Sequence, residues 1–130
     1  MSRHVATLSP DASVEQAWRT LVARRVGQAP VVDAARRLVG LISRERLLHV
    51  LNEEGGNLRD VRHRTVADVM VTPVVAAEPD AEVRRIARVL LECELPAVPI
   101  IDAAGQLVGI VSRSDVLRVV VTDPPLTLWV

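Results

Sequence analysis

Apolar residues recur at helical spacing in two stretches of the chain, residues 14–22 and residues 83–91. In each stretch they occupy positions i, i+3, i+4, i+7 and i+8, which lie on one face of an α-helix. These positions are Val14, Ala17, Trp18, Leu21 and Val22 in the first stretch, and Val83, Ile86, Ala87, Leu90 and Leu91 in the second. Ser13 and Gln16 have the spacing of a capping box, so the first helix is expected to begin after Ser13.

Each helical stretch is followed by two short apolar runs that predict a β-hairpin. The first runs end in aspartate, at residues 30–33 and 99–102, and small or turn-tolerant residues separate them from second runs at residues 38–42 and 107–111. Strands so close in sequence pair with each other. Because the runs are almost entirely apolar, we expect both faces of each sheet to be covered.

The chain is an internal duplication. Thr7–Leu51 aligns with Ala76–Val120 without a gap. The identical pairs include Pro10/Pro79, Asp11/Asp80, Val14/Val83, Leu21/Leu90, Pro30/Pro99, Asp33/Asp102, Leu38/Leu107, Gly40/Gly109, Ser43/Ser112, Arg44/Arg113 and Leu48/Leu117. A last helix is expected from Ser43 in one copy and from Ser112 in the other. Each copy therefore predicts the order β-α-β-β-α, an α/β protein of the α+β type in which two small repeats share the burial of their cores.

The duplication divides the chain into four parts. The first repeat is expected at residues 1–51, a polar linker at 52–65, the second repeat at 66–121 and a tail at 122–130. The tail ends in apolar residues that include Trp129, so we expect it to dock on the module or on a partner.

Composition excludes several classes of function. The formal net charge is zero, so nothing in the composition indicates nucleic acid or an anionic membrane as a partner. Only Trp18 and Trp129 are aromatic, too few to stack successive bases. No apolar stretch approaches the length of a membrane span. The single cysteine, Cys93, cannot form an internal disulfide, and a reducing cytoplasm is the expected compartment.

Short motifs in copy two recur in a fixed order, and copy one shows the same pattern from Thr7 to Leu51. The motifs are Val66–Met70, Thr72-Pro73, Pro79-Asp80, Val98–Asp102 and Gly105–Asp115. In order, spacing and duplication the chain resembles a pair of CBS domains, the repeat named after cystathionine β-synthase. The resemblance implies two repeats related by a pseudo-two-fold axis and packed through their sheets. It further implies clefts that in many relatives bind AMP, ADP, ATP, S-adenosylmethionine or NAD.

The ligand signature of that family is complete in copy two. It consists of glycine, two apolar residues, serine or threonine, two variable residues and aspartate, and Gly109–Asp115 matches it. Gly109 would let a ligand approach the backbone, and Ser112 would lie at a helix N-terminus that favours a phosphate. Arg113 would add a charge-assisted contact, and the carboxylate of Asp115 would accept hydrogen bonds from ribose hydroxyls.

The resemblance also implies an apolar slot for the adenine, lined by Val75, Ala76 and the segment from Leu95 through Pro96 and Ala97 to Val98. A purely structural interpretation of the signature stays open. Ser112 and Asp115 have the spacing of a capping box that does no more than start the last helix.

Copy one departs from the signature because Arg46 occupies the position of the ribose-binding aspartate. Arginine has only hydrogen-bond donors, so it cannot accept hydrogen bonds from the two hydroxyls of a ribose as a carboxylate does. Three alternatives follow: the first cleft is empty, Arg46 contacts phosphates in the neighbouring site, or Arg46 pairs with Glu45 or another acid. We favour one competent site, built around Asp115.

No other feature indicates catalysis or metal binding. His4, His49 and His63 have no metal-ligand spacing with one another or with Cys93, and no nucleophile elbow or phosphate loop occurs. The sequence therefore predicts a non-enzymatic regulatory module that requires no cofactor and binds an adenosine compound. The alternative is a ligand-free scaffold that regulates a partner protein.

Apolar residues outside one narrow helix face, Val50 and Val119, favour a homodimer that would cover them.

Overall fold

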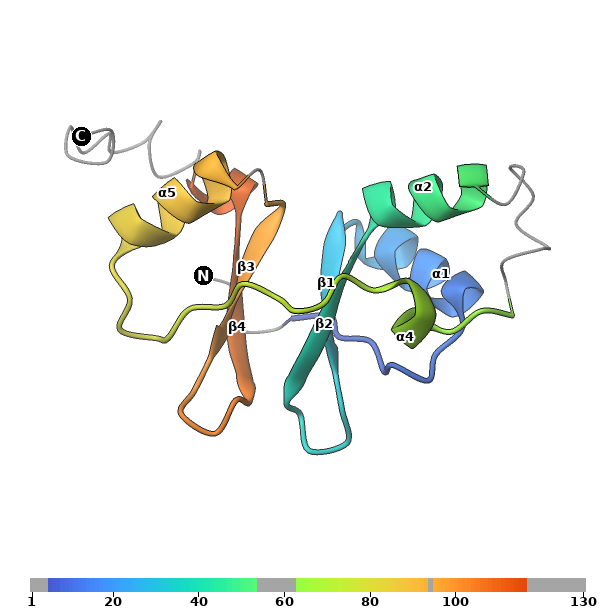
Figure 1. Cartoon of the computed structure of the whole chain (residues 1–130), viewed down its shortest axis with the longest axis horizontal. Helices are drawn as coiled ribbons and strands as arrows, with labels where there is room; N and C mark the ends of the chain where they lie inside the picture. The colour runs from blue at the N-terminus through green and yellow to red at the C-terminus, as the bar shows by residue number, and fades with distance from the viewer. Residues whose placement is uncertain (1–4, 54–62, 94, 117–130) are drawn as a thin grey trace. The chain divides into compact units, whose positions relative to one another are not determined.

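The computed structural model describes residues 5–53, 63–93 and 95–116. The chain divides into two compact units, one comprising Ala6–Val74 and the other comprising Val75–Val130 together with Met1–Val5. Each unit combines an antiparallel hairpin with helices, so the predicted α+β class is confirmed (Figure 1). None of the helices in the described part of the chain has the length and hydropathy that a bilayer span needs.

In its described residues, 6–53 and 63–74, the first unit has one hairpin and three helices. They are α1 (Val14–Arg24), β1 (Gln28–Val32), β2 (Leu38–Ser43), α2 (Arg44–Glu53) and α4 (Val66–Val69). Strands β1 and β2 pair antiparallel with Pro30 opposite Leu41. The strand predicted at the start of the repeat is a single parallel bridge between Leu8 and Val31. In Figure 1, α1 and α2 lie on the same side of this hairpin.

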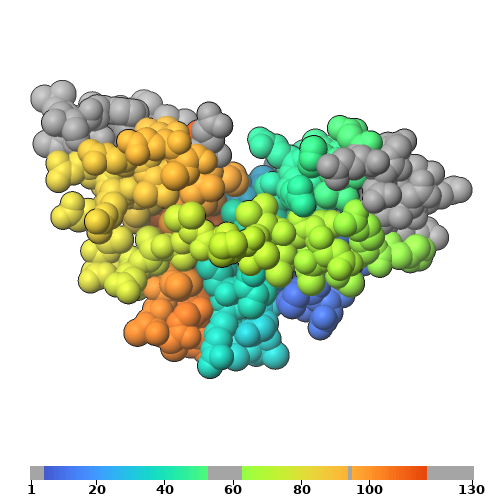
Figure 2. Space-filling view, viewed as in Figure 1, coloured from blue at the N-terminus to red at the C-terminus, as the bar shows by residue number. Residues whose placement is uncertain are grey.

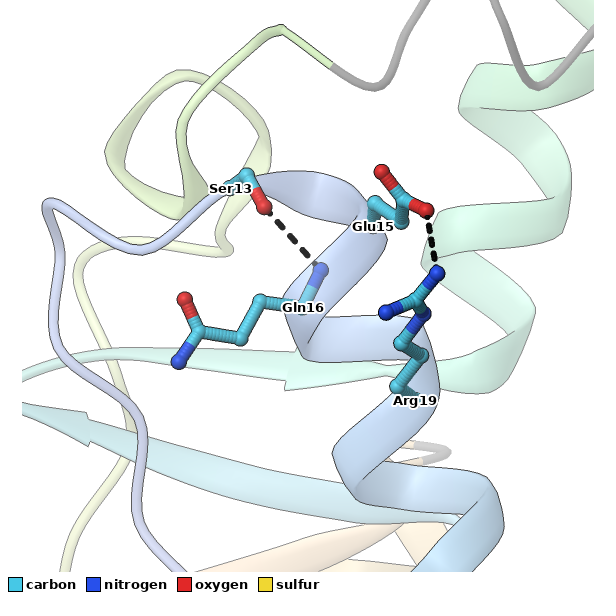
Figure 3. Close-up of polar contacts among 4 residues, drawn as sticks. All are labelled: Ser13, Glu15, Gln16 and Arg19. Carbon is cyan, nitrogen blue, oxygen red and sulfur yellow. Dashed lines mark hydrogen bonds and ion pairs between the residues drawn. The ribbon is translucent and has the colours of Figure 1, made fainter.

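Helix α1 begins as its sequence predicts. The hydroxyl of Ser13 accepts a hydrogen bond from the backbone N–H of Gln16 at 3.0 Å, which satisfies one of the open donors of the first turn. The side chain of Gln16 extends away from Ser13, so only the serine half of the capping box is formed (Figure 3). Glu15 and Arg19 pair at 2.8 Å on the exposed face, where such a pair contributes little stability.

The second unit repeats the arrangement. It contains α5 (Val83–Glu92), β3 (Ala97–Ile101) and β4 (Leu107–Ser112), and residues 113–116 form the start of a further helix. Strands β3 and β4 pair antiparallel in the register of the first hairpin, with Pro99 opposite Ile110. The first predicted strand is again one parallel bridge, between Ala77 and Ile100.

Burial confirms the centre of each predicted helical stripe and, except at Val14, corrects its ends. Leu21 and the equivalent Leu90 are 0% exposed. Val22, Val83 and Leu91 are exposed, although the periodicity placed them on the buried face. Val50 is only 1% exposed because it packs in the core of the first unit, so the expectation that a dimer would cover it was wrong. Val119 lies outside the described residues.

The segment that follows the linker packs on the first unit, although the sequence division assigned it to the second repeat. The backbones of Leu41 and Val71 exchange two hydrogen bonds, of 3.1 and 2.8 Å, along the outer edge of β2. Met70 fills the space beside Gly40, where an added Cβ would lie 2.3 Å from the Met70 sulfur. In Figure 2 the side chains of this green-yellow segment lie against those of α2.

Candidate functional site

Most residues predicted for the nucleotide site meet at one end of the β3–β4 hairpin. The register pairs Ala97 with Ser112 and Val98 with Val111, so the start of β3 lies beside the end of β4. The backbone N–H of Ala77 donates to the carbonyl of Pro99 at 2.9 Å. Because this contact is parallel, the preceding residues of the chain run back along β3 toward the same end.

Ser112 and Asp115 form a reciprocal cap at the start of the last helix. The backbone N–H of Ser112 donates to Oδ2 of Asp115 at 3.0 Å, and the backbone N–H of Asp115 donates to Oγ of Ser112 at 3.1 Å. The two residues therefore form the capping box that their spacing predicts. It is compatible with ligand binding, since a carboxylate offers about four acceptor positions and the cap orients the group in a half-buried setting.

Arg113 lies next to the predicted slot. Its backbone N–H donates to the carbonyl of Pro96 at 3.2 Å, and its residue surface is exposed. Together with Leu90, Leu91 and Val116, it lines a small hollow of about 280 Å³. Gly109, in contrast to the exposed Arg113, is buried in the middle of β4 opposite Ile100.

A larger groove of about 1110 Å³ runs along the second unit between the chain that precedes α5 and the helix itself. Three predicted slot residues line it: Val75, Ala76 and Val98. Three arginines of α5 also line it, and the sequence interpretation missed them: Arg84, Arg85 and Arg88. Their spacing in the sequence could have revealed them, because residues three and four positions apart lie on the same face of a helix.

The equivalent end of the first hairpin is built differently. The hydroxyl of Ser43 caps α2 by accepting from the backbone N–H of Arg46 at 3.0 Å. The Nε of Arg46 donates to the carbonyl of Val69 at 2.8 Å, which ties α2 to α4. None of the three interpretations of Arg46 from the sequence included a hydrogen bond to a backbone carbonyl.

Arg44, the counterpart of Arg113, keeps the same backbone contact, since its N–H donates to the carbonyl of Gly27 at 2.9 Å. Its guanidinium lies over the ring of Trp18, 5.9 Å from the centroid, a cation–π geometry. Trp18 has no aromatic counterpart in the second copy, where Ala87 occupies the position.

No group of three or more histidine, cysteine, aspartate or glutamate side chains in the described ranges could hold a metal ion. Cys93 is exposed at the end of α5 and contributes to the lining of the larger groove.

A family model for the CBS domain matches the chain twice, over residues 1–53 and 66–122. The chain belongs to the CBS domain family. The two matches coincide with the two halves of the duplication, so the resemblance inferred from the motifs is confirmed. The reciprocal cap at Ser112 thus lies in the second CBS repeat, and the tether of Arg46 to Val69 involves the first.

Proteins of other organisms resemble the chain over most of its length. A solved structure of CBSX2 of Arabidopsis thaliana in complex with AMP is 30% identical, covers 91% of this chain and 88% of that one, and has a TM-score of 0.79. A protein of Methanopyrus kandleri is 30% identical, covering 90% of this chain and 58% of its own length. Chloroplastic CBSX1 of Arabidopsis thaliana is 27% identical, with coverage of 85% and 57%. The chain thus spans somewhat over half the length of these two curated relatives.

Proposed function

We propose that this CBS pair is a non-enzymatic regulatory module that binds an adenosine nucleotide, with AMP as the first candidate, at the second repeat. One observation carries the proposal. It is the pairing of Ala97 with Ser112 at one end of the β3–β4 hairpin, toward which the parallel bridge of Ala77 to Ile100 directs the chain that precedes it. The similarity to a solved CBS-pair structure that contains AMP supports this choice of ligand.

Each residue of the proposed site has a distinct chemical role. The carboxylate of Asp115 accepts hydrogen bonds from the ribose hydroxyls while Ser112 holds it in place. The guanidinium of Arg113, fixed through its backbone bond to Pro96, contacts the phosphate. The adenine lies against a slot from the two flanking segments, in which Ala97 and Val98 are buried beneath Val75, Ala76 and Pro96. Gly109 is buried in β4 opposite Ile100, so it would act through the strand and not through a side chain.

We propose that the first repeat does not bind a nucleotide in the same way. Met70 fills the space beside Gly40, and the guanidinium of Arg46 already donates to Val69. Arg46 therefore has a structural role and lies outside the proposed site. The adenosine ligand would bind one conformation of the module more tightly than another and so increase its population. A partner protein would then recognise that conformation.

Titration calorimetry of the full chain with AMP, ADP, ATP, S-adenosylmethionine and NAD tests the proposal. We expect saturable binding of at least one compound with one site per chain. Asp115→Asn should weaken it about tenfold or more, a loss of about 1.4 kcal/mol. Asparagine keeps one acceptor oxygen for the N–H of Ser112 but removes the second oxygen and the charge, so the helix cap should survive.

Arg46→Gln is the matched control, since it changes the equivalent position of the first repeat and should leave the affinity within about twofold. If no compound binds the wild type, Ser112 and Asp115 form a helix cap only, and the scaffold alternative replaces the sensor.

We also propose a cytoplasmic homodimer, on two grounds. The exposed lone Cys93 fits a reducing compartment. Val22 and Leu48 are both large apolar side chains exposed on helices of the first unit. Sedimentation at tens of micromolar should show a dimer, and Leu48→Glu should convert it to a monomer of unchanged fold. A wild type that sediments as a monomer would refute the dimer.

A further inference from the structure

Helix α1 carries an indole ring at a position where α5 carries only a methyl group. The two residues, Trp18 and Ala87, are equivalent in the duplication. Trp18 packs against the core of the first unit, and the guanidinium of Arg44 lies 5.9 Å from the centroid of its ring. Because Arg44 is the first residue of α2, the indole links the two long helices of its repeat through a cation–π contact.

The equivalent place in the second unit has a small hollow of about 280 Å³, here called the α5 hollow. Its lining residues correspond one for one to residues beside Trp18 in the duplication. They are Leu90, Leu91, Arg113 and Val116, the counterparts of Leu21, Val22, Arg44 and Leu47. Ala87 lies one turn before the two leucines on the same face of α5, and its side chain ends at Cβ. Helix α5 therefore offers Arg113 no ring on which to stack.

The α5 hollow has the surfaces that a single large ring needs. Leu90 and Val116 belong to the buried core of the second unit, whereas Leu91 is 37% exposed and Arg113 is exposed. The volume lies below the range of about 300–1,000 Å³ that is usual for small-molecule pockets. A buried apolar surface beside a guanidinium is the same combination that Trp18 contacts in the first unit.

The chain has one other tryptophan, and it is tethered to the helix that borders the α5 hollow. Trp129 belongs to the tail, residues 122–130, which lies outside the described residues. It follows Val116 by thirteen positions. Thirteen residues span up to about 45 Å when extended and about 20 Å when helical. Pro124 and Pro125 cannot continue a helix, so the residues after them are able to turn back.

We propose that the tail folds back onto the second unit and places the indole of Trp129 in the α5 hollow. There the ring packs on the core and stacks on the guanidinium of Arg113, as Trp18 does with Arg44 in the first unit. The leucines of the tail supply apolar surface but no ring, so they do not reproduce the second contact. The inference is independent of nucleotide binding, and its test is made without nucleotide.

Fluorescence of the full chain carrying Trp18→Phe, in which Trp129 is the only tryptophan, tests the docking. We expect acrylamide to quench this fluorescence several-fold less than that of a free peptide of residues 122–130, because a docked ring is shielded from solvent. Leu91→Glu places a charge at the hollow and should raise quenching to the level of the free peptide. Ala87→Phe should do the same, because a ring on α5 would occupy the hollow. Circular dichroism checks that each variant is folded.

Val22→Glu is the matched control, since it places the same charge at the equivalent position of the first unit. It should leave the quenching of Trp129 unchanged. If Val22→Glu raised the quenching as much as Leu91→Glu does, the tail would dock elsewhere and the proposal would be overturned. Quenching in the Trp18→Phe chain as strong as in the free peptide would also overturn it.

A mixing experiment distinguishes the chain's own tail from the tail of a second copy. A chain with Trp18→Phe and Leu91→Glu is mixed, at about 10 μM, with a chain that carries Trp18→Phe and Trp129→Phe and so has an intact hollow but no tryptophan. Quenching should stay high, because a tethered tail reaches its own hollow at a millimolar effective concentration that a separate copy does not match. Restored protection of Trp129 would make a second copy the binding partner and would contradict the proposal.

Discussion

Leu21→Ala and Leu90→Ala should each lower the free energy of unfolding by about 2–5 kcal/mol, a large share of the total stability of a chain this size. Both side chains are 0% exposed and occupy equivalent positions in α1 and α5. Truncation removes buried apolar surface and leaves a cavity that the surrounding core can only partly fill. Urea denaturation followed by circular dichroism measures the loss directly.

The same two helices supply the controls. Val22→Ala and Leu91→Ala remove apolar atoms at the next position of each helix, where the side chain is exposed. Each should cost less than about 1 kcal/mol. If the leucine variants were no more destabilised than these controls, the assignment of Leu21 and Leu90 to the centres of the two cores would be wrong.

Gly40→Ala should destabilise the protein by about 1–3 kcal/mol, which is the second largest effect that we expect. The new methyl group would lie 2.3 Å from Sδ, 2.8 Å from Cγ and 3.2 Å from Cβ of Met70, so the side chain and the segment that carries it must both move. The variant thus tests whether residues 66–71 pack on the first unit. Chemical denaturation of the single and double variants measures the cost.

A matched glycine isolates the steric cause. An added Cβ at Gly27 meets nothing within 4 Å, so Gly27→Ala should be neutral or slightly stabilising. In a Met70→Ala background the contacts with Sδ and Cγ disappear and only the 3.2 Å contact with Cβ remains, so Gly40→Ala should then cost less than about 1 kcal/mol. A Gly40→Ala variant as stable as Gly27→Ala would contradict the placement of Met70.

The two copies of the duplicated signature have different roles in the proposed function. In both copies a serine hydroxyl caps the last helix, through Ser43 in one and Ser112 in the other. The residue three positions later then differs: Arg46 ties down α4, whereas Asp115 completes the cap with an acceptor group. A donor and an acceptor at equivalent positions cannot serve the same ligand, which is why we propose a single site.

The sequence alone determined the features that depend on neighbours along the chain. The helical stripes, the hairpins and the caps at Ser13 and Ser112 follow from local spacing and local hydrogen bonding, and the structure has them. The turns are equally local. Asp33 and Asp102 each accept two backbone hydrogen bonds in the hairpin turn, and the following positive-φ position is Arg36 in one copy and Gly105 in the other.

Only the tertiary structure decided which apolar positions are covered and by what. Periodicity places Val14 and Val83 on the same helix face, but a segment distant in sequence buries the first and leaves the second exposed. Val50 is buried for the same kind of reason, and the bond of Arg46 to Val69 joins residues on either side of the linker. Such contacts depend on packing between separate elements, and the local pattern of polar and apolar residues does not encode which elements meet.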